Sequence, residues 1–279
     1  MLHKTIYLNE IFSSLDTATT CPTLDIYMQN RSAKIDANRK RPCIIICPGG
    51  SYMYTSDREA EPVAMHFLAH GFNACVLRYS TLPNQFPRQL LELSATIAHI
   101  RRNSDEWGVE PEQIVVLGFS AGGHLAGSIG VHWDKDFATE GLELLPEENK
   151  PNKLVLCYPL ISTDPNLYAL PAQAQMLVKT FSPLNFEQEI SLENHVSENT
   201  PPTFLWHTLD DVIVNVENSF KFALALRKNN VPLEMHIYPQ GVHGLSLATT
   251  QTTHENNLDL IDEHINSWAD LASEWIKRY

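Results

Sequence analysis

The chain has 279 residues, of which 43% are hydrophobic and 19% are charged. This length and hydrophobic content allow one domain with a large core and argue against a disordered protein. The formal net charge is −13, from 33 acidic and 20 basic residues. Such a charge disfavours nucleic acids and anionic membranes as partners, because their phosphate groups repel an acidic surface.

The amino-terminal stretch MLHKTIYLNEIFSS has no continuous apolar run and no small-residue cleavage pattern, so we expect no signal peptide. Elsewhere the apolar runs are far shorter than the roughly 20 residues that span a bilayer, which predicts a soluble, cytoplasmic protein. Neither the five cysteines nor the twelve histidines fall at short metal-binding spacings. The sequence therefore predicts small buried cysteines, no metal site and no cofactor.

Short apolar runs alternate with helical patterns along the chain. Strands are predicted at 41–47, 73–80, 113–119, 152–159, 203–207 and 232–239. Helices are predicted at 60–71, 87–103, 121–132 and 216–230, with a last helix between Leu258 and Trp275. This β-α-β-α order predicts an α/β fold with a mostly parallel sheet and helices on both faces. Two weakly alternating segments, around 3–11 and 23–29, are expected to add antiparallel edge strands.

Two longer segments interrupt this alternation, an acidic one at 134–150 and one rich in Pro, Asn and Ser at 160–200. We expect both to emerge at the carboxyl ends of strands, where open α/β sheets bind ligands, and to cover a pocket. An inert surface loop is an equally good interpretation of the acidic segment. Because no internal repeat or linker interrupts the chain, residues 1–279 are predicted to form a single domain.

The stretch VVLGFSAGGHLAG, from Val115 to Gly127, places one serine between glycines at the end of an apolar strand. It contains GFSAG, which fits the G-x-S-x-G pattern of a sharp strand-to-helix turn that exposes a nucleophile. The following helix would direct backbone N–H groups and its positive dipole end at Ser120. The pattern alone also fits a structural serine, but its place in an alternating α/β chain favours a catalytic nucleophile.

A nucleophilic serine needs a general base, and in this kind of fold an acid and then a histidine follow the serine along the chain. His243 stands in the glycine-flanked loop YPQGVHG after a predicted strand, where a base is expected. The acid is expected in the segment TLDDVIVN, where Asp210 or Asp211 could orient the imidazole. The local sequence leaves this choice open.

Attack by a serine on a carbonyl group also needs backbone N–H groups directed at the developing oxyanion. The amide of Ala121, directly after the serine, is one candidate. The loop PGGSY after the strand at 41–47 offers others, and we expect Gly50 and Ser51 to donate while Gly49 permits the turn. Gly49 and Tyr52 are candidate pocket residues, although Tyr52 fits a packed loop aromatic equally well.

Other polar residues near these motifs have structural interpretations. His124 is expected to pack or cap the helix after Ser120, and His207 to hydrogen-bond the acid loop. Arg58 and Glu59 are expected to form a solvated or cap-stabilising pair at the start of a helix.

Together these segments resemble the α/β-hydrolase superfamily, and within it the acetyl esterases, acetylxylan esterases and related small carboxylesterases. The resemblance rests on PGGSY, REAEPVA, VLRYS, GFSAGGHLAG, PPTFLWHTLDDVIV and YPQGVHG. In that family the acid begins a D-x-V-V-P segment. DVIVN fits this frame with Asn215 in place of proline, which favours Asp211. Pro48 stands where the family's HGGG motif has histidine, which keeps the backbone donors but removes a polar side chain.

The resemblance implies ester hydrolysis through a covalent acyl-serine, with Ser120 as nucleophile, His243 as base and Asp211 as acid. The expected substrate is a small ester of a short acyl group, acetyl foremost, with sugar esters among the candidates. The sequence is compatible with a homo-oligomer and does not determine the oligomeric state. One alternative is a serine peptidase of the prolyl-oligopeptidase type, disfavoured because few residues precede the strand at 41–47. Another is a non-enzymatic binding module on a hydrolase scaffold, disfavoured by the complete set of three residues.

Overall fold

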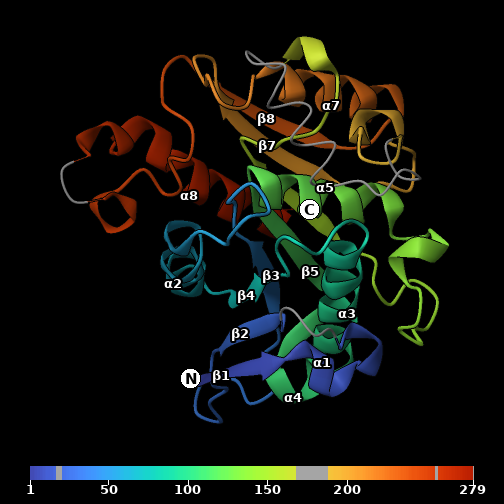
Figure 1. Ribbon diagram of the computed structural model, residues 1–279. Coiled ribbons are helices and arrows are strands. Elements are labelled where there is room, and N and C mark those ends of the chain that lie inside the picture. The colour runs from blue at the N-terminus through green and yellow to red at the C-terminus, as the bar shows by residue number, and fades with distance from the viewer. Residues whose placement is uncertain (17–20, 168–187, 255–256, 279) are drawn as a thin grey trace.

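One eight-stranded sheet runs through the computed structural model, which describes residues 1–16, 21–167, 188–254 and 257–278 (Figure 1). The strand order is β1-β2-β4-β3-β5-β6-β7-β8. Pairing is antiparallel between β1 and β2 and between β2 and β4, and parallel from β4 through β8. The expected mostly parallel sheet with antiparallel edge strands is therefore confirmed. The strands are β1 (Leu2–Tyr7), β2 (Thr23–Met28), β3 (Arg41–Cys47), β4 (Asn73–Arg78), β5 (Val109–Phe119), β6 (Lys153–Cys157), β7 (Thr203–Thr208) and β8 (Leu233–Tyr238).

Helices cover both faces of the sheet, because alternate residues of each central strand point to opposite sides. In β3, Ile45 and Cys47 join the core beneath α3 (Arg88–Arg102), α5 (Ala121–His132) and α7 (Glu217–Lys228). Ile44 and Ile46 join a second core beneath α2 (Glu61–Ala69) and α8 (Glu263–Arg278). Figure 1 shows α2 and α8 on one side of the sheet and α3 and α7 on the other. Two further helices among the described residues are short, α1 (Leu8–Ile11) and α4 (Ser104–Trp107).

The last helix begins later than predicted. Residues Leu258–Leu260 form a separate 3-10 turn, and α8 begins at Glu263. The Oδ1 atom of Asp262 accepts a hydrogen bond of 3.0 Å from the amide of Ile265, so Asp262 caps the new helix start. The apolar spacing continues across this break, which is why periodicity alone did not reveal it. No helix among the described residues is long and apolar enough to cross a membrane.

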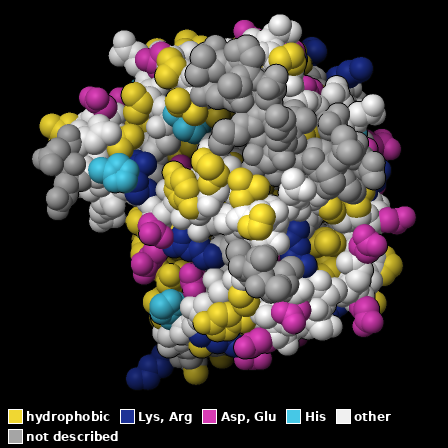
Figure 2. Space-filling model, in the orientation of Figure 1, with side chains coloured by type: hydrophobic (Ala, Val, Ile, Leu, Met, Phe, Trp, Pro, Cys, Tyr) yellow, Lys and Arg dark blue, Asp and Glu magenta, His cyan; other side chains and the backbone are white. Residues whose placement is uncertain are grey.

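Four of the five cysteines are buried and free, as predicted, whereas Cys21 is exposed. The acidic and basic side chains are interspersed over the face in Figure 2, with no extended basic patch among the coloured residues. This distribution agrees with the acidic net charge of the sequence.

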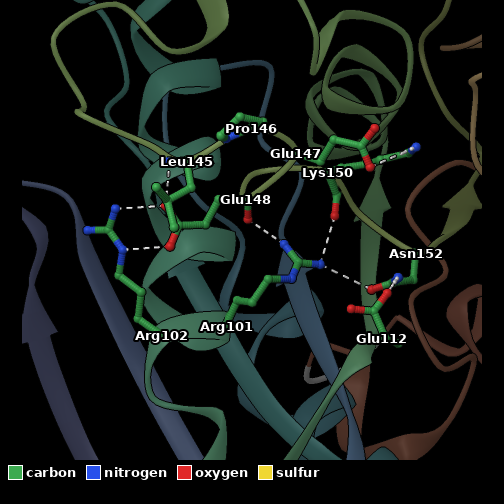
Figure 3. Close-up of a pocket in the computed structure, with 9 residues that line it drawn as sticks. All are labelled: Arg101, Arg102, Glu112, Leu145, Pro146, Glu147, Glu148, Lys150 and Asn152. Carbon is green, nitrogen blue, oxygen red and sulfur yellow. Dashed lines mark hydrogen bonds and ion pairs between the residues drawn. The ribbon is translucent and has the colours of Figure 1, made fainter.

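The acidic segment 134–150 lies at the opposite end of the sheet from the one we expected. It follows α5 and leads into β6, so it sits at the amino ends of the strands. Figure 3 shows Arg101 and Arg102 pointing into it: Arg101 binds the carbonyl oxygens of Glu148 and Lys150, and Arg102 pairs with the Glu148 carboxylate. The prediction was wrong because the segment follows a helix, and the chain has by then returned to the amino end.

The segment 160–200 does emerge at a carboxyl end, because it directly follows β6. The amide of Leu160 donates to the carbonyl of Ser120 at 3.2 Å. Residues 168–187 lie outside the described residues, so the expected pocket cover is described only at its two ends.

Candidate active site

Ser120 occupies the turn between β5 and α5 with an unusual backbone conformation, φ 53° and ψ −116°. Its amide donates to the carbonyl of Cys157 at 3.1 Å, which ties the turn to the neighbouring strand β6. The flanking glycines are required by close packing. A Cβ atom at Gly122 would lie 2.1 Å from the Cys47 carbonyl oxygen, and one at Gly118 would lie 2.0 Å from that of Gly122. The serine thus stands at the end of the central strand and at the start of a twelve-residue helix.

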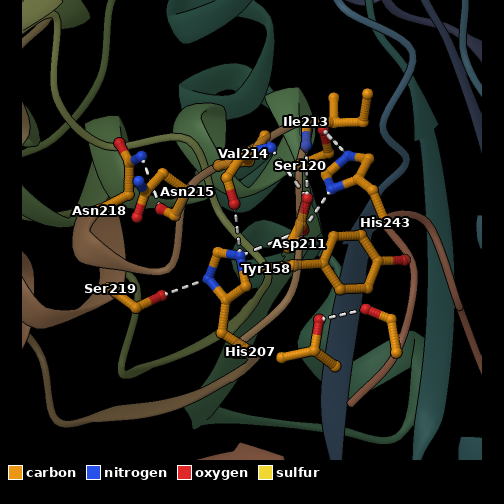
Figure 4. Close-up of polar contacts among 12 residues, drawn as sticks. Ser120, Tyr158, His207, Asp211, Ile213, Val214, Asn215, Asn218, Ser219 and His243 are labelled. Carbon is orange, nitrogen blue, oxygen red and sulfur yellow. Dashed lines mark hydrogen bonds and ion pairs between the residues drawn. The ribbon is translucent and has the colours of Figure 1, made fainter. Parts of the chain in front are cut away.

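The structure brings Ser120, His243 and Asp211 into one hydrogen-bonded chain (Figure 4). The Ser120 Oγ atom lies 2.9 Å from His243 Nε2, and His243 Nδ1 lies 2.7 Å from Asp211 Oδ2. These residues come from three separate loops at the carboxyl ends of β5, β7 and β8. Asp210, the other candidate acid, is exposed, whereas Asp211 is buried beside the imidazole.

The Asp211 carboxylate is surrounded by hydrogen-bond donors. Its Oδ1 atom accepts from the amides of Ile213 and Val214, both at 2.9 Å, and its Oδ2 atom accepts from His243. Burial alone would raise the pKa of Asp211, but hydrogen bonds from His207 and His243 outweigh it and hold the pKa well below the ordinary value. The carboxylate is therefore ionised across the neutral pH range.

His207 supports this carboxylate from the other side. Its Nε2 atom lies 3.2 Å from Asp211 Oδ2 and 2.9 Å from the carbonyl oxygen of Val214. A carbonyl only accepts, so Nε2 carries the proton, and Nδ1 accepts from the Ser219 hydroxyl at 2.7 Å. The expected contact between His207 and the acid loop is thus present, and it reaches the carboxylate itself.

The loop after β3 approaches Ser120 with positive φ at three consecutive residues. Gly50 has φ +129°, where a Cβ atom would lie 2.1 Å from the Tyr54 carbonyl oxygen. Ser51 and Tyr52 both have φ 55°, which is strained for a residue with a side chain. Ala121 is the first residue of α5, so its N–H is among the groups that a helix leaves without an internal partner. Gly49 is buried, and a Cβ atom on it would lie 3.1 Å from the Ser120 Cβ atom.

Tyr52 points into the protein interior. It is buried, and its hydroxyl lies 3.1 Å from Nδ1 of His124. The other ring nitrogen of His124 lies 2.9 Å from the carbonyl oxygen of Ile190. Tyr52 therefore matches the packed loop aromatic that the sequence allowed as an alternative to a pocket residue, and His124 packs as expected.

Glu59 is a buried side chain beneath the site, with only 4% of its surface exposed. No side chain among the described residues caps the start of α2, so Glu59 is neither solvated nor cap-stabilising as expected. Its Oε2 atom accepts from the amide of Gly49 at 2.8 Å, and its Oε1 atom accepts from the Tyr158 hydroxyl at 2.6 Å. The Tyr158 ring in turn packs edge-on against His243, with ring centroids 5.1 Å apart. Glu59 thus connects the loop after β3 to the histidine.

Arg58 and the Tyr158 hydroxyl hold the loop that carries His243. Arg58 donates to the carbonyl oxygen of Gly244 at 2.8 Å, and its own carbonyl accepts from the Ser246 hydroxyl at 2.7 Å. The amide of Ser246 donates to the Tyr158 hydroxyl at 2.9 Å. Local sequence gave no sign of these contacts, because they join residues that lie far apart in the chain.

This strand order, with a strained serine between a central strand and a helix, defines an α/β-hydrolase. The chain belongs to the BD-FAE family, whose model matches residues 24–226. The acetyl ester-xyloside bifunctional hydrolase from Caldicellulosiruptor lactoaceticus has 34% identity and a TM-score of 0.80, with 99% of this chain and 96% of that one aligned. The carboxylesterase Cest-2923 from Lactobacillus plantarum WCFS1 has a TM-score of 0.85 over 100% of this chain and 98% of that one. At 24% identity, that likeness concerns the fold.

Two curated relatives extend this picture. Endo-1,4-beta-xylanase B of Butyrivibrio fibrisolvens is 35% identical over 82% of this chain and 35% of its own length. The acetylxylan esterase of Xylanibacter ruminicola is 26% identical over 80% of this chain and 45% of its own length. The chain thus spans less than half the length of either relative. The expected relationship to carboxylesterases and acetylxylan-esterase-like enzymes is confirmed.

Proposed function

We propose that the protein is a serine carboxylesterase that hydrolyses short-chain acyl esters, acetyl esters of sugars foremost. The observation that supports this most directly is the chain of contacts from Ser120 Oγ through His243 to Asp211, at 2.9 and 2.7 Å. Both distances allow proton transfer without rearrangement. Under this proposal, the relatives named as esterases share their reaction with this chain.

The direction of proton transfer follows from the ionised Asp211. A carboxylate accepts hydrogen bonds, so His243 carries its proton on Nδ1 and turns the lone pair of Nε2 to the Ser120 hydroxyl. Ser120 Oγ attacks the ester carbonyl while Nε2 takes its proton, and the resulting imidazolium protonates the departing alcohol. Water then attacks the acyl-serine with His243 again as base. Each step uses the chain's own side chains and water.

We assign the stabilisation of the tetrahedral oxyanion to the amides of Ala121, Gly50 and Ser51. Ala121 begins α5, so its amide adds the positive end of the helix dipole. The left-handed conformations of Gly50 and Ser51 turn the backbone of the loop after β3 sharply beside the serine. Glu59 contributes indirectly, because it holds the amide of Gly49 directly before these two residues.

The substrate class rests on the relatives. One is named an acetylxylan esterase and another an acetyl ester-xyloside bifunctional hydrolase. We therefore propose that an acetyl group is the acyl part of the preferred substrate and that a xylose-type sugar is the alcohol part.

A hydrolysis panel tests the proposal. It compares p-nitrophenyl acetate, butyrate and octanoate with acetylated xylose and xylooligosaccharides, and includes aminoacyl-proline substrates for the peptidase alternative. We expect the highest kcat/KM on acetyl esters and, in Ser120→Ala, a loss of about 10⁴-fold or more. Labelling of Ser120 by a fluorophosphonate should disappear in the same variant. Unchanged turnover in Ser120→Ala would refute the serine mechanism, and preference for octanoate would refute the acetyl assignment alone.

A further inference from the structure

Three side chains meet at the end of α5 that is remote from Ser120. His132 is the last residue of α5, Glu189 lies before a 3-10 turn at Leu192–Asn194, and His195 follows that turn. The Oε2 atom of Glu189 lies 3.9 Å from His132 Nδ1 and 3.6 Å from His195 Nδ1. The three ligand atoms all lie within 4.8 Å of one another, close to the spacing of donors around one metal ion.

Backbone carbonyls fix both imidazole rings in the orientation that a metal requires. The Nε2 atom of His132 lies 2.8 Å from the carbonyl oxygen of Glu189, and that of His195 lies 2.9 Å from the carbonyl oxygen of Gln188. A carbonyl oxygen only accepts, so each ring donates from Nε2 and directs the lone pair of Nδ1 toward the Glu189 carboxylate. Metal-binding histidines are held in this manner, with one nitrogen on the metal and the other on a backbone or carboxylate oxygen.

His132 gives independent evidence for a missing partner. Its side chain is fully buried, and within the described residues its Nδ1 atom has no hydrogen-bond partner. A buried polar atom without a partner is costly, and it calls for an explanation such as an ion. Glu189 and His195 are partly exposed, so an ion could enter from solvent.

We propose that His132, Glu189 and His195 form a Zn²⁺ site. Two imidazole nitrogens and one carboxylate oxygen are ligands that Zn²⁺ accepts, and water can supply the fourth position of its tetrahedron. Ca²⁺ and Mg²⁺ prefer oxygen ligands alone, so the two nitrogens disfavour them. The ligands lie on segments far apart in the sequence, which is why spacing along the chain predicted no metal site.

An ion at this site would stabilise the fold and would take no part in ester hydrolysis. The proposal of this site therefore does not depend on the proposed function. The length of α5 separates His132 from Ser120 by roughly 18 Å at 1.5 Å per residue. The ion would fasten the segment 188–195 to the end of α5. The carbonyl of Ile190 in this segment binds His124, which in turn contacts Tyr52 in the loop after β3. Zn²⁺ would therefore stabilise the fold and the segment bordering that loop.

A second cluster provides a matched control. His66, His70 and Asp270 also bring three ligand atoms together, on α2 and α8. There His70 Nε2 contacts Asp270 Oδ1 directly at 3.1 Å, whereas His66 Nε2 has no hydrogen-bond partner among the described residues. The His66 side chain is 18% exposed and Asp270 is 66% exposed, so this cluster lies at the surface and lacks a fully buried ligand such as His132. His70→Gln removes a histidine from it and leaves the His132 site intact.

The test is calorimetric titration of the full chain with ZnCl₂, in a Cys21→Ser background that removes the exposed thiol. The parent and His70→Gln should bind one Zn²⁺ with equal affinity, whereas His195→Gln and Glu189→Gln should bind it at least about tenfold more weakly. Thermal unfolding should show a rise in Tm with Zn²⁺ in the first pair only, because a ligand stabilises the state that binds it. Circular dichroism of the metal-free variants checks that they are folded.

In the parent protein, Co²⁺ should give the visible absorption of a tetrahedral site, and Zn²⁺ should abolish it. This measurement needs no variant and stands if His195→Gln fails to fold. Absence of Zn²⁺ binding by the parent, equal binding in all variants, or loss of binding in His70→Gln would each overturn the proposal.

Discussion

The two ends of the sheet use polar side chains in different ways. At the carboxyl ends, Ser120, His243 and Asp211 form one hydrogen-bonded chain, and the serine is held in a strained conformation. At the amino ends, Arg101 and Arg102 bind the carbonyls and the carboxylate of the segment 134–150. Both ends are rich in polar contacts, yet only the first presents a nucleophile with its base. A concentration of polar contacts therefore does not identify a catalytic site by itself; the chemistry of the converging atoms does.

After the loss of the nucleophile itself, the largest effect should come from Asp211→Asn at the carboxyl end. Asparagine has nearly the same shape but also donates hydrogen bonds, so it favours the wrong tautomer of His243. By analogy with other serine hydrolases, kcat should fall by about 10⁴-fold. Asp210→Asn is the matched control, because Asp210 is exposed and adjacent. Steady-state kinetics on p-nitrophenyl acetate would contradict the assignment if the two variants lost activity equally.

Glu59→Gln should affect both stability and catalysis. Glu59 accepts two hydrogen bonds, from Gly49 and Tyr158, and glutamine can accept only one of them with its single oxygen. A buried donor left unpaired costs about 1–3 kcal/mol of unfolding free energy. We also expect kcat/KM to fall, since the loop before Gly50 loses its support. Urea unfolding and kinetics measure both effects, with the exposed Glu61→Gln as control. Equal behaviour of the two variants would show that Glu59 has no positioning role.

Acid should weaken the carboxyl end through Asp211. Its folded pKa lies below the unfolded value, so its stabilising contribution is complete above about pH 4 and is lost as the pH falls toward the folded pKa. This adds at most about 1.4 kcal/mol per pH unit to the acid dependence. Urea unfolding at a series of pH values should show a shallower dependence below pH 4 in Asp211→Asn. Parallel curves for the two proteins would contradict this role of Asp211.

The smallest effect is expected at the amino end. Arg102→Ala removes two contacts of 2.7 Å to Glu148, but the arginine side chain is 40% exposed, so the loss of unfolding free energy should be about 1 kcal/mol. The kcat/KM should stay unchanged. Arg102→Lys keeps the charge without the paired geometry and should lose less. A fall in kcat/KM for Arg102→Ala would contradict the view that the carboxyl end of the sheet is catalytic and the amino end only structural.

Much of the fold could be predicted from sequence, because buried parallel strands such as 41–47 are continuous apolar runs. The turn at Ser120 was equally accessible, since the G-x-S-x-G pattern is contiguous in the sequence and the glycine at 118 is required by its close neighbour Gly122, although the glycine at 122 is required by the distant carbonyl of Cys47. The choice of Asp211 over Asp210 needed either a family resemblance or the structure. Neighbouring residues of identical type differ here only in burial.

Contacts between distant segments could not be predicted. Glu59 lies in a short polar stretch, and its burial depends on Tyr158, which lies 99 residues away. The predicted position of the segment 134–150 was wrong for a different reason. Its composition is that of a surface loop, and composition does not tell at which end of a sheet a loop lies.

The backbone at Ser120 sets a trade-off between reactivity and robustness. A non-glycine residue held at a positive φ costs about 1–3 kcal/mol, which glycine would largely avoid. The chain could therefore become more stable by giving up its serine, and a search for thermostable variants that ignores activity would favour Ser120→Gly. Stability screens of this protein consequently need an activity readout, because the substitution that most relieves this turn is the one that removes the nucleophile.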